Sequence, residues 1–203
     1  MIRKNNFSTA PLVEASIILL LCLLYSIIRY NIFAEVEWID LPLFVFNKAL
    51  ALSSLILFAH FQFSKNKPNS GDKKYLREYA IIFVVLHILI SAVILTPVYF
   101  SKFFNLQKLN VIGVLSIFFG ILAFGLLLPL INKNGFKEIY NRFKSKQTVG
   151  NIFFTLTAAH VIIMGFKGWF EPNTWPGGLP PITMISFVVA VFPLMSNLMF
   201  RKN

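Results

Sequence analysis

The sequence predicts an all-α membrane protein with six transmembrane helices and both termini in the cytoplasm. The first observation behind this prediction is composition: of 203 residues, 57% are hydrophobic and 13% are charged, and the mean hydropathy is +0.71. A soluble domain of this size would cover its core with more polar residues. The second is patterning, because the apolar residues gather in stretches of about 20, the length that a helix needs to cross a bilayer.

Six apolar segments have this length, and their polar connections leave no room for a soluble domain. We therefore expect residues 1–203 to form a single transmembrane domain. Arg3 and Lys4 precede the first segment, but its apolar run is longer than that of a signal peptide and no small-x-small cleavage site follows, so we expect a retained helix. The predicted segments are 12–34, 42–63, 76–99, 110–131, 149–169 and 181–200.

Basic residues set the predicted orientation, because cytoplasmic loops of membrane proteins are enriched in Lys and Arg. With the N-terminus inside, 14 of the 19 cations fall on the cytoplasmic side. This asymmetry and attraction to anionic lipid account for the net charge of +11, so we expect the bilayer, and no nucleic acid, as its partner. We expect a multi-pass protein of the bacterial plasma membrane. The outer half holds Arg29, Lys48, Lys102, Lys108 and Lys167.

Two histidines, His87 and His160, lie inside the third and fifth apolar segments. An ionisable ring in hydrocarbon is costly and is usually functional. Each stands 11 positions after its segment begins, and both helices run outward, so both rings are expected at one depth, about 16 Å from the inner face. Each ring then either hydrogen-bonds to a neighbouring helix or faces the other histidine across a gap.

Two facing imidazoles without a Cys, Asp or Glu beside them suit a b-type haem better than zinc, which needs further protein ligands. The apolar helices would form the walls of such a site. Ser91 and Thr157 carry hydroxyls that we expect to orient the rings. Arg29, Lys48 and Lys167 are expected to meet the haem propionates or to attract an anionic acceptor at the outer face.

His60 differs from this pair. Its helix runs inward, so the ring is expected near the cytoplasmic face, at a depth where no second histidine lies to complete another haem site. We interpret His60 as a surface ring or one satisfied by its neighbours, and contact with a cofactor on the cytoplasmic side is the alternative. Glu14, near the inner end of the first segment, is the one carboxylate expected within the membrane.

The sequence resembles a known family, the STEAP metalloreductases (six-transmembrane epithelial antigen of the prostate). The fifth segment, "VGNIFFTLTAAHVIIMGFKGWF", is similar to the corresponding helix of that family, and so is the loop that follows it. The third segment is similar through Leu76, Phe83 and Leu86-His87. The similarity runs in order along nearly the whole chain. Further matching positions are Gly150, Gly165, Lys167, Trp169, Trp175, Leu179-Pro180, Lys73-Lys74 and Asn47-Lys48.

The resemblance implies a six-helix bundle with one haem b, ligated by His87 and His160. It implies a flavin such as FAD at the inner leaflet, electrons passing outward to ferric or cupric chelates, and a homotrimer. Phe118 or Phe119 would be the counterpart of an aromatic residue between flavin and haem. The residues implied as flavin contacts are Lys73, Lys74, Arg77, Lys144, Lys146 and Gln147.

The sequence departs from the family in two respects. It has no G-x-G-x-x-G, so we expect no NADPH binding by that route and assign the donor role to a separate cytoplasmic reductase or reduced flavin. Arg77 replaces a glycine of the family.

From the resemblance and the separate donor, we expect a metalloreductase-like electron conduit. Such a protein needs no acid–base catalytic residue, because the cofactor carries the chemistry.

Two other functions remain open. The chain is alternatively a haem b membrane subunit that exchanges electrons with a protein or quinone partner and does not itself reduce metals. A haem-free transporter or assembly factor is the third hypothesis, in which His87 and His160 are ordinary interhelical hydrogen-bonding residues. Loss of haem on substitution of either histidine distinguishes the first two from the third.

Overall fold

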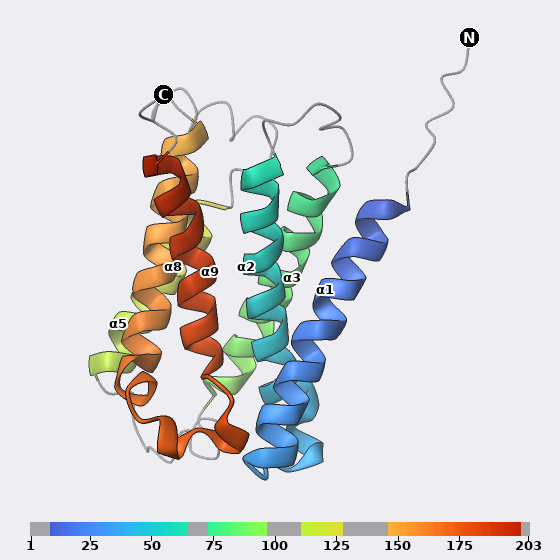
Figure 1. Cartoon of the computed structure of the whole chain (residues 1–203), viewed down its shortest axis with the longest axis vertical. Coiled ribbons are helices and arrows are strands. Elements are labelled where there is room, and N and C mark those ends of the chain that lie inside the picture. The colour runs from blue at the N-terminus through green and yellow to red at the C-terminus, as the bar shows by residue number, and fades with distance from the viewer. Residues whose placement is uncertain (1–8, 65–72, 97–110, 128–145, 200–203) are drawn as a thin grey trace.

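The computed structural model describes residues 9–64, 73–96, 111–127 and 146–199, and within these ranges the chain is helical and contains no strand. Six helices lie side by side, so the predicted all-α class is confirmed (Figure 1). They are α1 (Ala10–Ile27), α2 (Phe46–Ser64), α3 (Lys73–Ile94), α5 (Val111–Gly125), α8 (Lys146–Trp169) and α9 (Ile182–Met199).

Five of these helices, with their short extensions, are long and apolar enough to cross a membrane. The shorter sixth, α5, has 15 residues, and its predicted continuation to 131 lies outside the described ranges. The first helix begins and the last one ends at the same end of the bundle, where α3 and α8 also begin (Figure 1). This agrees with the predicted placement of both termini on one side, which the excess of cations leads us to expect on the cytoplasmic side.

Helix boundaries follow local chemistry. The first helix continues into a π-helical segment at Ile28–Phe33, and a second such segment, Leu41–Val45, leads into α2. The third helix ends at Ile94 and does not reach the predicted residue 99. The sequence explains this, because Pro97 follows and a residue before proline avoids helical geometry.

The second helix is the centre of the packing. It packs against α1, α3 and α9, while α5 and α9 both pack against α8. By contrast, α3 and α8 do not pack closely on each other. The bundle therefore has two halves that meet at α2 and α9, with the backbones of α3 and α8 held apart.

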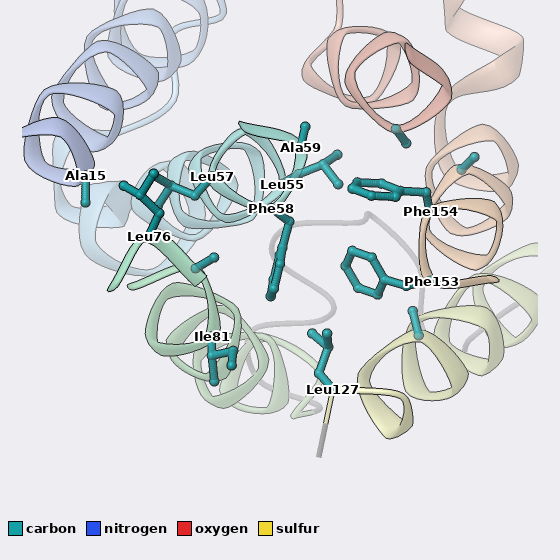
Figure 2. Close-up of a cluster of buried hydrophobic side chains, with 14 residues drawn as sticks. Ala15, Leu55, Leu57, Phe58, Ala59, Leu76, Ile81, Leu127, Phe153 and Phe154 are labelled. Carbon is teal, nitrogen blue, oxygen red and sulfur yellow. The ribbon is translucent and has the colours of Figure 1, made fainter. Parts of the chain in front are cut away.

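An aromatic contact joins the two halves near the inner end. The rings of Phe58 from α2 and Phe153 from α8 lie 5.1 Å apart between centroids, and they point toward each other in the cluster of Figure 2. Phe154 and Leu127 extend the same cluster. Many large apolar side chains instead point outward, for example Leu21 and Ile121. An outer surface made of apolar side chains suits contact with lipid tails, which are as apolar as these side chains.

The connection between α8 and α9 is tied to α1 at the opposite, outer end. The Tyr25 hydroxyl donates to the Pro180 carbonyl (2.5 Å), and the Arg29 guanidinium donates to the Leu179 carbonyl. Gly177 adopts φ = 60°, and its backbone lies directly against the Phe33 ring. A side chain at Gly177 would meet both backbone strain and that ring.

Close packing of α8 on α9 depends on Gly165. A Cβ at this position would collide with Thr183 Oγ1 and Trp169 Nε1, the two atoms of a 2.9 Å hydrogen bond between these helices. Gly168, one turn later, has nothing within 4 Å of an added Cβ. The two glycines therefore form a matched pair of positions on one helix.

We expect Gly165→Ala to lower stability by about 1–3 kcal/mol through overpacking and loss of the Trp169–Thr183 bond. Gly168→Ala should be neutral or slightly stabilising, because alanine is the better helix former. Thermal unfolding of both variants in detergent measures the difference. Equal melting temperatures would contradict the described α8–α9 contact.

Candidate functional site

The ring of His87 on α3 is held by α2. Its Nδ1 lies 2.8 Å from Asn47 Oδ1 and 3.3 Å from the Asn47 carbonyl oxygen. The Asn47 amide nitrogen in turn donates to Ser91 Oγ at 3.0 Å, which fixes the orientation of the amide. Both oxygens near Nδ1 can only accept, so Nδ1 carries the proton and Nε2 keeps a free lone pair.

The ring of His160 on α8 is held in the same way by α5. Its Nδ1 lies 2.7 Å from the carbonyl oxygen of Ser116 and 3.0 Å from the Ser116 hydroxyl. A carbonyl only accepts, so Nδ1 again donates and Nε2 is again left with a lone pair. Gly120 makes this approach possible, because a Cβ there would lie 3.1 Å from the ring nitrogen.

The two rings belong to the two halves of the bundle. Each is the fifteenth residue of its helix, because α3 and α8 both begin three residues before the predicted positions. His160 lies within the range of an electrostatic influence on His87. That the two rings face each other across one gap stays a prediction.

This arrangement fits the axial sites of a haem. A porphyrin supplies four ligands to its iron and needs two more from the protein, each an imidazole nitrogen with a free lone pair. Acceptors on the opposite ring nitrogen are the usual partners of metal-binding histidines. Among the described residues, no three His, Cys, Asp or Glu side chains gather into a site for a bare metal ion.

The outer cations are only partly brought together. Lys48 and Arg29 both lie against the Tyr30 ring, at 5.1 and 5.5 Å from its centroid, and Lys48 also interacts electrostatically with His87. Arg29 is buried, holds the outer connection and leaves its Nε without a partner. Lys167 is exposed on the last turn of α8. Of these three cations, Lys48 is the one with an electrostatic influence on His87.

The residues implied as flavin contacts lie at the cytoplasmic end. Lys73 and Lys74 open α3, and Lys146 and Gln147 open α8, but their side chains are not described; Lys144 lies outside the described ranges. The guanidinium of Arg77 stacks over the Phe61 ring at 5.9 Å, with its Nε buried and unpartnered. The helix starts that carry these residues share one end of the bundle (Figure 1).

The two candidate relay residues form one aromatic pair on α5. Phe118 and Phe119 lie 5.6 Å apart in an edge-to-face arrangement. They stand between Ser116 and Gly120, the two residues that contact His160. Phe118 is half exposed, at 53%. Both residues are thus near the histidine pair along the chain, with Phe118 on the outward face.

Sequence reasoning missed Asn47 and Ser116, the residues that orient the rings. Ser91 does not contact the His87 ring directly but accepts a hydrogen bond from Asn47, which does. The hypothesis for Thr157 was wrong, because its hydroxyl donates to the Phe153 carbonyl of its own helix (2.9 Å). Backbone bonding of this kind is common for Thr inside helices. The available signals were a lone amide at Asn47 and the spacing of four between Ser116 and Gly120, which places both on one helix face.

His60 lies near the inner end of α2, away from the other two histidines. Its Nδ1 contacts Oε1 of Glu14 on α1, and the two side chains are 45% and 37% exposed. The prediction that this ring is satisfied by a neighbour is confirmed. Its partner is the one carboxylate that was expected within the membrane.

No model of a known protein family matches this chain, and no curated protein matches it either.

The ring contacts predict an unusual proton position in both histidines. In protein prepared without haem, His87 and His160 should carry their proton on Nδ1, because only acceptors face that nitrogen. Nitrogen chemical shifts of ¹⁵N-labelled histidine at pH 8 measure this directly. Protonation of Nε2 in either ring would contradict the described hydrogen bonds.

Proposed function

We propose that this chain carries electrons across the membrane through one haem b held by His87 and His160. Electrons enter from a donor at the cytoplasmic end and leave to ferric or cupric chelates at the outer face. One observation supports the proposal: two imidazoles stand at matched positions on helices from separate halves of the bundle, and each is fixed through Nδ1. With the proton on Nδ1, each Nε2 carries the lone pair that an iron ligand needs.

The protein residues supply ligation, orientation and insulation. Hydrogen bonds from Nδ1 to Asn47 and Ser116 set the tautomer and make each Nε2 more basic. His87 and His160 would hold the haem, which would supply one-electron chemistry between ferric and ferrous iron; ligation by both histidines would favour electron transfer over oxygen binding. Apolar side chains around the rings exclude water and keep the site at low dielectric.

The two ends of the bundle have different roles in this proposal. At the outer end, the charges of Lys48, Arg29 and Lys167 favour haem propionates and anionic metal chelates. At the inner end, the starts of α3 and α8 and Arg77 would favour the phosphates of FAD. Phe118 or Phe119 would shorten the path between flavin and haem, and the homotrimer implied by the resemblance belongs to the same proposal.

Haem content is the first expected outcome. A dithionite-reduced-minus-oxidised absorption spectrum of the purified protein should show a sharp b-type α band, and His87→Ala and His160→Ala should each abolish it. Gly120→Val should also lose haem, because the new side chain displaces the His160 ring. Gly125→Val is the matched control on α5, with nothing within 4 Å of an added Cβ, and should keep the band.

A flat wild-type spectrum after expression with added haem would overturn the proposal. The histidines would then be structural. Equal haem loss in Gly120→Val and Gly125→Val would attribute the effect to α5 as a helix and not to the ring contact.

Chelate reduction is the second expected outcome. In vesicles that contain the haem-loaded protein and an internal pool of reduced flavin, external ferric citrate should become ferrous, as read with a ferrous-specific dye. The rate should fall to that of empty vesicles in His160→Ala. If the haem becomes reduced but iron stays ferric until a quinone or a redox protein is added, the subunit function replaces the metalloreductase function.

A further inference from the structure

The two histidines are oriented by chemically different partners. Nδ1 of His160 lies 2.7 Å from the backbone carbonyl oxygen of Ser116, an acceptor that a change of side chain does not remove. Nδ1 of His87 lies 2.8 Å from the side-chain oxygen Oδ1 of Asn47, and the carbonyl oxygen of the same residue is farther away, at 3.3 Å. The hydrogen bond of one ring thus depends on the main chain, whereas that of the other depends mainly on one amide side chain.

The amide of Asn47 is itself held by a second contact. Its NH₂ group donates to Ser91 Oγ at 3.0 Å, which leaves Oδ1 to face the His87 ring. Ser91 stands four residues after His87, so the hydroxyl and the ring lie on one face of α3 and hold between them an amide that comes from α2. Asn47 is 7% exposed, so water competes little for either end of the amide.

The opposite orientation of the amide would be incompatible with iron ligation. If the amide turned by 180°, its NH₂ group would face Nδ1 of His87, which would then have to accept. The ring proton would move to Nε2, and that atom would lose the lone pair that binds a metal. The Asn47 carbonyl at 3.3 Å opposes this state, because it needs a donor at Nδ1. Ser91 opposes it as well, because it accepts the NH₂ group on the far side.

We propose that Asn47, held by Ser91, is the positioning residue that sets the reduction potential of the haem through His87. The inference rests on the proposed function, because this potential exists only when haem is bound. A hydrogen bond from Nδ1 to an oxygen makes Nε2 a stronger donor, and a stronger donor favours ferric over ferrous iron. Loss of the Asn47 acceptor should therefore raise the potential, while the hydrogen bond of His160 to Ser116 is unchanged.

The test is a redox titration of the full haem-loaded chain in detergent, followed at the α band. Asn47→Leu should raise the midpoint potential most, because the ring keeps only the carbonyl at 3.3 Å. Ser91→Ala should raise it less, because the amide stays but loses its partner, and Ser91→Thr keeps a hydroxyl and should match wild type. Ser54→Ala is the matched control on α2 and should also match wild type, because its hydroxyl donates within its own helix to the Ala51 carbonyl (2.8 Å).

A second readout needs no haem. In protein prepared without haem, ¹⁵N shifts should show part of His87 protonated on Nε2 in Asn47→Leu, with His160 unchanged.

The outcomes separate this inference from the proposed function. Bound haem with equal potentials in wild type, Asn47→Leu and Ser91→Ala would overturn only the inference, as would an equal rise in Ser54→Ala. If Asn47→Leu does not retain haem, a higher potential in Ser91→Ala than in Ser91→Thr supports the inference and equal values overturn it. A wild type that binds no haem would overturn the proposed function and this inference with it.

Discussion

The structure depends on the cost of placing an imidazole in hydrocarbon. A neutral imidazole has one donor and one acceptor nitrogen, and each needs a partner where water is absent. In His87 and His160 the described contacts of Nδ1 are to acceptors of Asn47 and Ser116, so Nε2 keeps its lone pair. The haem proposed above would use both lone pairs with one group, and it would lie where α3 and α8 do not pack closely on each other.

The central helix links the features of both ends. Near its start α2 presents Asn47 to His87, and near its end it presents His60 to Glu14. Phe58, between these points, contacts the other half of the bundle through Phe153. One helix thus orients the His87 ring, joins the two halves, and contacts α1 through His60 and Glu14. Changes in the register of α2 would alter all three at once, because side chains on one helix move together.

Much of this was predictable, and the exceptions have physical reasons. Apolar length places each helix, and the equal positions of His87 and His160 along their segments predict that they meet. The hydrogen bond from His160 was harder to predict than that from His87, because Ser116 accepts it through its backbone carbonyl, an atom that every residue carries. The prediction for Thr157 failed for a related reason, because its hydroxyl donates to a backbone carbonyl of its own helix, that of Phe153. The Glu14–His60 contact needs the relative rotation of α1 and α2, which helical periodicity alone does not determine.

The central claim is that both histidines ligate one iron, and electron paramagnetic resonance of the oxidised, haem-loaded protein tests it most directly. The account predicts a low-spin ferric signal characteristic of two imidazole ligands in wild type, converted to a high-spin signal or lost when either histidine is replaced. A high-spin signal in wild type, or a low-spin signal that survives in His87→Ala, would show that the two rings do not ligate one iron.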